Sequence, residues 1–186
     1  MLKGKCVVLG VTGGIAAYKA AAIVSGLKKL HADVRVIMTE NATRFIAPLT
    51  FETLSGNQTY VSSFEKTWEI EHISLAKAAD LLLIAPCTAN MIGKIACGIA
   101  DDLLSTTAMA TTAPILLAPA MNCNMYLSAA NQQNLATLKA RGVKFVGPDS
   151  GHLACGDDAI GRMSEPEKVI EAVCEALYPK SDFAGR

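Results

Sequence analysis

Two asparagines and a cysteine follow directly after one of the most apolar stretches of the chain. Residues 121–126 read MNCNMY, and they come after ILLAPA, a run that predicts a buried strand ending at a proline. In an open parallel sheet, ligands bind just outside the carboxyl ends of the strands. The polar residues of this segment are therefore where chemistry is expected first.

A glycine-rich loop, GVTGGIAAYK, places Gly13 and Gly14 where a helix is expected to begin. Free backbone N–H groups and the helix dipole at such a point can hold a phosphate. The loop is neither a GxGxxG motif nor a GK[ST] loop, and tight packing of a helix on a strand would also require glycines. Glu40 ends the second expected strand, where a dinucleotide fold holds ribose, so an NAD site stays open as an alternative.

Small polar residues also follow two other expected strands. They occur in MTEN, residues 38–41, and in PCTANM, residues 86–91. In a parallel sheet these segments would lie beside the glycine-rich loop. Three converging loops with little positive charge indicate a monophosphate that is held by backbone and hydroxyl donors.

His72 and Cys155 are the candidates for proton transfer and thiol chemistry. His72 stands near the start of an expected helix, in EHISLAKAAD, although a lone histidine is more often structural or exposed. Cys155, in GHLACGDD, lies in a glycine-rich loop long enough to form a flap, where a thiol would be accessible. Cys6 and Cys97 fall in apolar runs and are expected in the core.

Other kinds of catalytic centre are not indicated. The sequence shows no Ser/His/Asp order, no paired carboxylates and no spacing of metal ligands, so no metal site is expected. The aspartate pairs at 101–102 and 157–158 are interpreted as helix caps or solvated charge.

Alternating apolar runs and helical patterns place these residues in one kind of fold. Nearly continuous apolar runs predict strands buried on both faces of a parallel sheet, at residues 5–11, 32–39, 79–86, 113–120 and 143–148. Helices are predicted from Ile15 to Leu27 and over 91–110, 128–142 and 165–178, and residues 52–74 are expected to hold loops with a short helix. This order predicts a doubly wound α/β sandwich with right-handed crossovers.

Composition limits the possible classes of protein. The chain has 186 residues, of which 51% are apolar, so one compact domain over residues 1–178 with a frayed tail over 179–186 is expected. Lys plus Arg and Asp plus Glu both number 17, so no net field recruits nucleic acid or an anionic membrane. Six cysteines without CxxC pairing, and no leader or membrane-length run, favour a cytoplasmic protein over a disulfide-linked secreted one.

Four motifs in order resemble one known family. GVTGGIAAYK, EHISLAKAADLLLIAPCTANMIGKIACGIADDLL, APAMNCNMY and ACGDDAIGRM together resemble the phosphopantothenoylcysteine decarboxylases, which are members of the flavin-containing cysteine decarboxylases. The resemblance implies a flavodoxin-like three-layer sandwich and bound FMN. It also implies trimers that can assemble into dodecamers, with the flavin near a subunit interface. The family's substrate is 4′-phospho-N-pantothenoylcysteine, and its products are 4′-phosphopantetheine and carbon dioxide on the route to coenzyme A.

The resemblance also implies which residues of this chain form the site. It places the following residues at FMN: Gly13, Gly14, Ile15, Thr39, Asn41, Thr88, Ala89, Asn90, Met91 and Ala120. It places these at the substrate: Asn122, Met125, His152, Leu153 and Ala154. Two positions differ from the family pattern, because Met91 stands where threonine is common and Tyr126 replaces a tryptophan. A backbone contact is therefore expected at Met91.

In the family mechanism, FMN supplies the electron sink that an unactivated cysteine carboxylate lacks. The resemblance implies that His72 is the base for oxidation of the substrate thiol. Asn122 would donate to the substrate carboxylate, and Cys155 would act as the acid in the final reduction.

Three other functions are weighed against this one. A peptidyl-cysteine decarboxylase shares the fold and the flavin, but the complete ACGDD segment favours an enzyme with a reductive half-reaction. A regulatory flavoprotein that binds a phosphatase is disfavoured because His72, Asn122 and Cys155 occur together. A flavin prenyltransferase would require more arginines around a prenyl phosphate.

Overall fold

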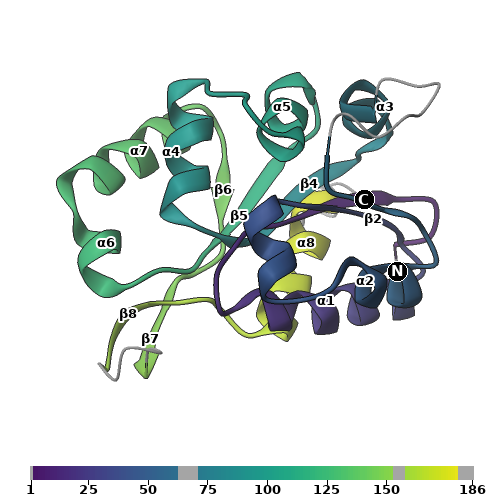
Figure 1. The fold of residues 1–186 in the computed structure, drawn as a ribbon, viewed down its shortest axis with the longest axis horizontal. Helices are drawn as coiled ribbons and strands as arrows, with labels where there is room; N and C mark the ends of the chain where they lie inside the picture. Colours follow the sequence, from purple (N-terminus) through teal and green to yellow (C-terminus); the bar gives the residue numbers. More distant parts are fainter. Residues whose placement is uncertain (1, 63–70, 153–157, 180–186) are drawn as a thin grey trace, which may run out of the picture.

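A six-stranded parallel sheet forms the centre of the molecule (Figure 1). The computed structural model describes residues 2–62, 71–152 and 158–179, except the side chains of residues 152 and 158. The strands of the sheet are β1 (Cys6–Val11), β2 (Asp33–Met38), β3 (Thr59–Tyr60), β4 (Leu81–Cys87), β5 (Ile115–Pro119) and β6 (Lys144–Phe145). The five strands predicted from the sequence are confirmed, and the two-residue β3 is an addition.

The order of the strands shows where the chain changes the direction in which it adds strands to the sheet. The order is β3-β2-β1-β4-β5-β6, and every neighbouring pair is parallel. The chain runs outward from β1 to β3 and then returns to β4 on the other side of β1. Doubly wound sheets bind ligands at this switch point, beyond the carboxyl ends of the two strands. The expected doubly wound, flavodoxin-like fold is therefore confirmed.

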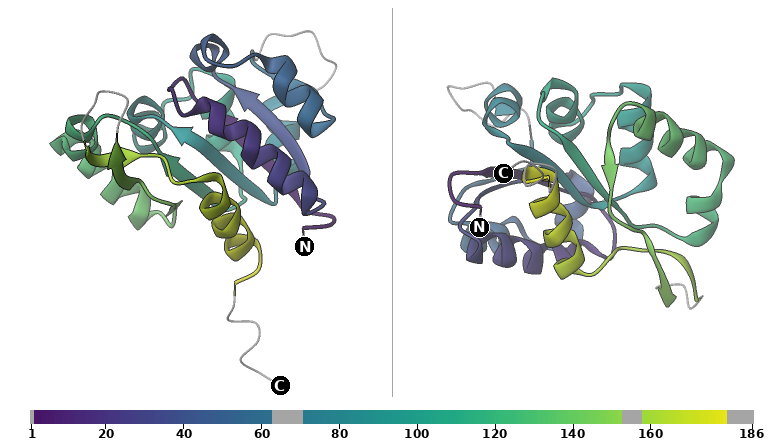
Figure 2. Two further views of the ribbon diagram at one scale, coloured as in Figure 1. Left: turned by 90° about the horizontal axis from the view of Figure 1, so that it is seen from below. Right: turned by 180° about the vertical axis from the view of Figure 1, so that it is seen from behind.

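Helices cover both faces of the sheet (Figures 1 and 2). One face carries α1 (Ala17–Lys29), α2 (Pro48–Ser55) and α8 (Pro166–Leu177), and the other carries α3 (Glu71–Ala78), α4 (Ala89–Cys97), α5 (Leu103–Ala110) and α7 (Ala129–Ala140). Two short elements follow strand ends, the 3-10 helix η1 (Glu40–Arg44) and α6 (Cys123–Leu127). None of the helices in the described residues is long and apolar enough to span a bilayer.

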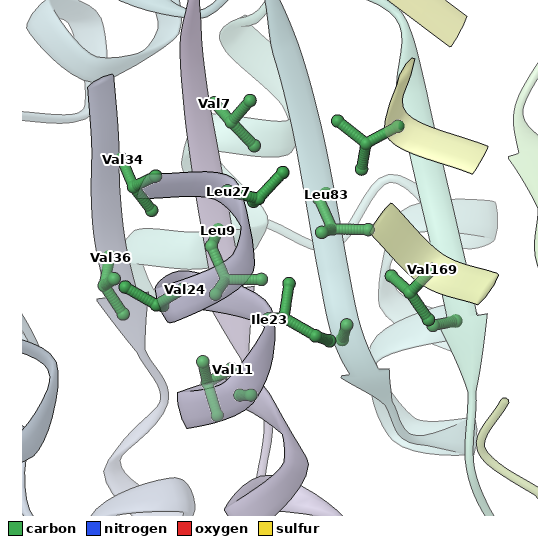
Figure 3. Close-up of a cluster of buried hydrophobic side chains, with 14 of the residues drawn as sticks. Val7, Leu9, Val11, Ile23, Val24, Leu27, Val34, Val36, Leu83 and Val169 are labelled. Carbon is green, nitrogen blue, oxygen red and sulfur yellow. The ribbon is translucent and has the colours of Figure 1, made fainter. Parts of the chain in front are cut away.

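Successive side chains of a strand point to opposite faces of the sheet, and this divides the apolar core into two clusters. Val7, Leu9 and Val11 of β1 point toward α1, where they meet Ile23 and other apolar side chains of that helix (Figure 3). Val8, between them, belongs to the cluster on the opposite face with residues of α3, α4, α5 and α7. Full burial of each such side chain stabilises the fold by about 1.5–3 kcal/mol.

The helix predicted over residues 91–110 is in fact two helices. α4 ends at Gly98, whose φ of 70° is left-handed, and α5 begins after Asp102. Asp102 caps α5 through a capping box with Ser105, which confirms the interpretation of this aspartate as a cap. The break exposes Cys97, so its assignment to the core was wrong, whereas Cys6 is buried as predicted.

Two other segments differ from the sequence prediction. The segment expected to hold loops with a short helix contains the end of α2, which starts earlier at Pro48, and the strand β3. The segment MNCNMY contains the short helix α6, which was not predicted and which begins after the capping side chain of Asn122. Both added elements are too short to produce a recognisable hydrophobic period.

An antiparallel hairpin stands apart from the main sheet. It consists of β7 (Asp149–His152) and β8 (Asp158–Arg162), at the lower left of Figure 1. Met121, just beyond β5, donates its N–H to the carbonyl of Gly161 at 3.0 Å and so attaches the hairpin to the end of the sheet. Residues 153–157, which include Cys155, lie outside the described residues.

Candidate functional site

Two adjoining cavities lie beyond the carboxyl ends of β1, β2, β4 and β5. The larger has a volume of about 660 Å³ and the smaller about 420 Å³, and both are lined by Gly13, Thr88 and Met125. Cavities of a few hundred Å³ are typical of small-molecule sites. The cavities therefore meet at the switch point between β1 and β4.

The structure gathers the residues that the resemblance places at FMN around these cavities. The larger cavity is lined by Gly13, Gly14, Ile15, Thr88, Ala89 and Ala120. The smaller cavity is lined by Thr39, Asn41, Asn90 and Met91. Asn122 and Met125 also line the larger cavity.

The glycine-rich loop permits a close approach between two strand ends. A Cβ atom on Gly13 would lie 2.5 Å from the Cβ of Asn41, so a side chain here would push the two loops apart. A Cβ on Gly14 would instead make an ordinary contact of 3.8 Å with the methyl of Thr88. Gly14 donates its own N–H to the carbonyl of Thr12 at 3.0 Å, whereas the N–H groups of Gly13 and Ile15 have no acceptor within the described residues. Two backbone donors thus remain for a ligand.

Three side chains at neighbouring strand ends cap the helices that follow. Thr39 accepts a hydrogen bond from the N–H of Ala42, and Thr88 accepts one from that of Met91, both at 3.3 Å. Asn122 Oδ1 accepts from the N–H of Asn124 at 2.8 Å. A capping threonine uses its oxygen as the acceptor, so its hydroxyl hydrogen can still be donated to a ligand. These caps explain why polar residues follow the buried strands.

Positive charge at the larger cavity was not foreseen from the sequence. Lys19 is 7% exposed and lines the cavity, where its ammonium donates to the carbonyl of Met163 at 3.2 Å and to Glu165 Oε1 at 3.1 Å. Arg162 lines the same cavity and pairs with the same carboxylate at 2.5 Å. The hydrogen bond from Lys19 lowers the pKa of Glu165, so the three groups form a charged cluster.

A second charged group borders the smaller cavity. Lys94 donates to both Asp101 and Asp102 at 2.7 Å. Burial raises the pKa of Asp102, but hydrogen bonds from Lys94 and Ser105 outweigh it, so the pKa lies below the ordinary value of 3.8. Glu40, on which the NAD alternative depended, also lines this cavity.

His72 lies away from both cavities. It is half-buried in α3 and is not among the residues that line either cavity. Figure 1 places α3 at the upper right, whereas α6 and the hairpin lie at the left. The remaining predicted positions cannot be placed, because Leu153, Ala154 and Cys155 and the side chain of His152 lie outside the described residues.

Comparisons with known proteins show the family of this chain. A family model described as Flavoprotein matches residues 1–178. The chain belongs to the flavoprotein family. Among curated members of this family, the coenzyme A biosynthesis bifunctional protein CoaBC of Haemophilus influenzae is 48% identical over 186 residues, or 99% of this chain and 46% of that protein. The chain thus spans less than half the length of this relative.

Solved structures of flavoprotein-family members share the fold. A PPC decarboxylase mutant complexed with pantothenoylaminoethenethiol superposes with a TM-score of 0.80 at 31% identity, covering 91% of this chain and 96% of that one. The FMN-dependent cysteine decarboxylase SpaF gives a TM-score of 0.84 at 29% identity, with 95% and 97% covered.

Proposed function

We propose that this chain is an FMN-dependent decarboxylase that converts 4′-phospho-N-pantothenoylcysteine to 4′-phosphopantetheine and carbon dioxide in coenzyme A biosynthesis. The likeness to PPC decarboxylase and to CoaBC supports this reaction. The single observation that carries the proposal is the clustering of the predicted FMN residues around two cavities that meet at Gly13 and Thr88.

The residues of the cavities fit FMN. Backbone N–H groups at Gly13 and Ile15 and the hydroxyls of Thr39 and Thr88 are suited to a phosphate. Gly13 lets its loop approach Asn41 closely, because a Cβ atom there would lie 2.5 Å from the Cβ of Asn41. Ala89 and Ala120 give the larger cavity a wall of small side chains for a planar ring. When bound, FMN supplies the electron sink that decarboxylation of a cysteine requires.

Asn122 is proposed to hold the carboxylate that leaves as carbon dioxide. Its Oδ1 accepts the capping hydrogen bond on α6 and its side chain lines the larger cavity, where its amide nitrogen is proposed to donate to the substrate carboxylate. A neutral amide orients the carboxylate without the strong ion pair that would stabilise the ground state. Met125 lines the same cavity and is proposed to contact the substrate.

Two proton-transfer roles complete the proposal. His72 is proposed as the base for thiol oxidation, and Cys155 as the acid for the final reduction, with His152, Leu153 and Ala154 covering the substrate. Since His72 does not line the cavities of its own chain, we propose that it acts in the site of a second copy. A homotrimer, which can form a dodecamer, would provide such a copy. One domain over residues 1–178 and a cytoplasmic location remain predictions.

The test is mass analysis of purified protein mixed with phosphopantothenoylcysteine, with the visible spectrum recorded alongside. A flavin spectrum and a product lighter by carbon dioxide alone would support the proposal. Protein without flavin, or with flavin but without turnover, would contradict it.

Decarboxylation of a peptide's carboxyl-terminal cysteine is a second candidate, supported by the likeness to SpaF. The same mass analysis separates the two candidates. Enzymes of this second kind stop before the reduction, so their product would be lighter than the substrate by carbon dioxide and two further hydrogens.

A further inference from the structure

Thr12 occupies the switch point between β1 and β4 and has no role in the site described so far. It follows directly after β1, it is 1% exposed, and it lines the smaller cavity.

The hydroxyl of Thr12 joins the ends of the two strands. Its Oγ1 donates to the carbonyl of Pro86 at 2.6 Å and accepts from the N–H of Thr88 at 3.1 Å. Gly10 pairs with Ile84, so the parallel register brings Thr12 level with Pro86. Proline has no N–H and cannot continue a ladder of backbone hydrogen bonds. The backbone N–H of Thr12 also points to the Pro86 carbonyl, at 3.4 Å, so the shorter hydrogen bond from the hydroxyl reinforces this connection and extends it to Thr88.

This connection fixes two of the loops that line the cavities. The N–H held by Thr12 belongs to Thr88, which caps α4 and lies at the junction of both cavities. On the chain itself, Thr12 is followed at once by Gly13 and Gly14. The adjacent Val11 carbonyl accepts from the N–H of Thr39 at 3.0 Å, so the third loop is attached one residue away.

We propose that Thr12 is a positioning residue. It sets the separation between the loop that contains Gly13 (the Gly13 loop) and the loop that contains Thr88 (the Thr88 loop), so that its hydroxyl determines flavin affinity. The inference rests on the proposed flavin site. Serine would retain both hydrogen bonds, whereas valine has the same shape and neither. Without the hydroxyl, the Pro86 carbonyl loses a buried donor and the Thr88 N–H loses its acceptor, so the loops can separate.

The experiment is titration of flavin-free protein with FMN, followed by quenching of flavin fluorescence. We expect T12S to bind FMN within about twofold of the original protein, and T12V to bind at least roughly tenfold more weakly. T12A, which removes the same hydroxyl without a second methyl, serves if T12V does not fold. Tight binding by T12V or T12A, equal to that of T12S, would overturn the inference.

A matched control separates positioning from general stability. Thr107 of α5 is fully buried, its hydroxyl donates to the Leu103 carbonyl at 2.7 Å, and it lines neither cavity. T107V should bind FMN like the original protein even if its thermal unfolding temperature falls. If T107V and T12V lose affinity equally, Thr12 acts through stability alone and the inference fails. If the original protein binds no FMN, both the proposed function and the inference fail. If the original protein binds FMN and only the variants depart from expectation, the inference alone fails.

Discussion

Asn122 both caps α6 and lines the larger cavity, and one substitution can separate these two properties. In N122D, a carboxylate oxygen can still accept from the N–H of Asn124, and aspartate is as good an N-cap as asparagine. The amide donor is lost, however, and a negative charge would face the substrate carboxylate. We expect kcat/KM to fall by about 100-fold or more, as when one donor to a reacting group is removed.

The measurement is carbon dioxide release together with thermal unfolding. N122D should keep the cap on α6, so its unfolding temperature should fall less than that of N122A. N122A should be less stable by about 1 kcal/mol because it also loses the cap. Full activity in N122D would show that the amide nitrogen has no part in catalysis.

At this scale, the polar residues that follow strands could be predicted from the parallel sheet, whereas Lys19, within a helix, could not. Thr39, Thr88 and Asn122 come directly after buried strands, so their place at the ligand edge follows from the parallel sheet. Lys19 was missed because a lysine within a helix is usually solvated. The signal was its spacing, since Lys19 lies four residues before Ile23, which is fully buried on the same face of α1.

The break between α4 and α5 depends on a left-handed glycine, and a pair of substitutions can test it. Gly98 has a φ of 70°, and a Cβ there would make only an ordinary contact of 3.7 Å with Met109. G98A should therefore cost about 1 kcal/mol of unfolding free energy through backbone strain alone. Gly93 lies within α4, where a Cβ would lie 3.6 Å from Asn134, so G93A should stabilise by about 0.5–1 kcal/mol. Urea denaturation of both variants measures the two changes in unfolding free energy, which should have opposite signs. Changes of the same sign would contradict this account.

Asp102, at the start of α5, should make stability depend on pH. Its pKa is lowered in the folded protein, so its contribution is complete above the unfolded value near 3.8 and is lost as the pH falls through the folded value. D102N keeps a capping oxygen but loses the charge opposite Lys94. We expect D102N to be less stable by roughly 1 kcal/mol at neutral pH, with the difference shrinking as the pH falls below 3.8.

Urea denaturation between pH 7 and about pH 3 measures this difference. D101N is the control, because Asp101 contacts the same lysine but its side chain is 60% exposed. Its effect should stay below about 0.5 kcal/mol. A constant gap between D102N and the original protein across the pH range would rule out the charge as the cause.

Elements with a sustained pattern were predicted, and short or interrupted ones were not. The apolar strands and α8 have clear patterns over several residues. The helix predicted over residues 91–110 failed because apolar residues lie on both sides of the break, so hydrophobic period alone does not show it. The left-handed glycine and the Asp102 cap were the available signals.

For the whole molecule, strand-and-helix alternation predicted the class of fold but not which strands are neighbours. The return of the chain from β3 to β4 is what places the Gly13 loop against the Thr88 loop. This strand order brings Gly13 and Thr88 together although they are far apart in the sequence. It also leaves His72 on α3, away from the cavities, which the sequence could not reveal.

This position of His72 leads to a prediction about the assembled protein. H72N should lose turnover while keeping its flavin, because the side chain lines neither cavity of its own chain. N122D should be inactive for a different reason, since it alters the cavity itself. If each site combines Asn122 of one copy with His72 of another, the two inactive variants can complement each other.

Coexpression of H72N and N122D with different tags, followed by purification on both tags, would give mixed oligomers. In every mixed trimer, one of the three sites combines an intact Asn122 with an intact His72, so about a third of the original activity should return. If both residues act within one chain, no mixed oligomer holds a complete site and activity stays absent. The mixed sample therefore decides whether the catalytic unit is one chain or an interface between copies.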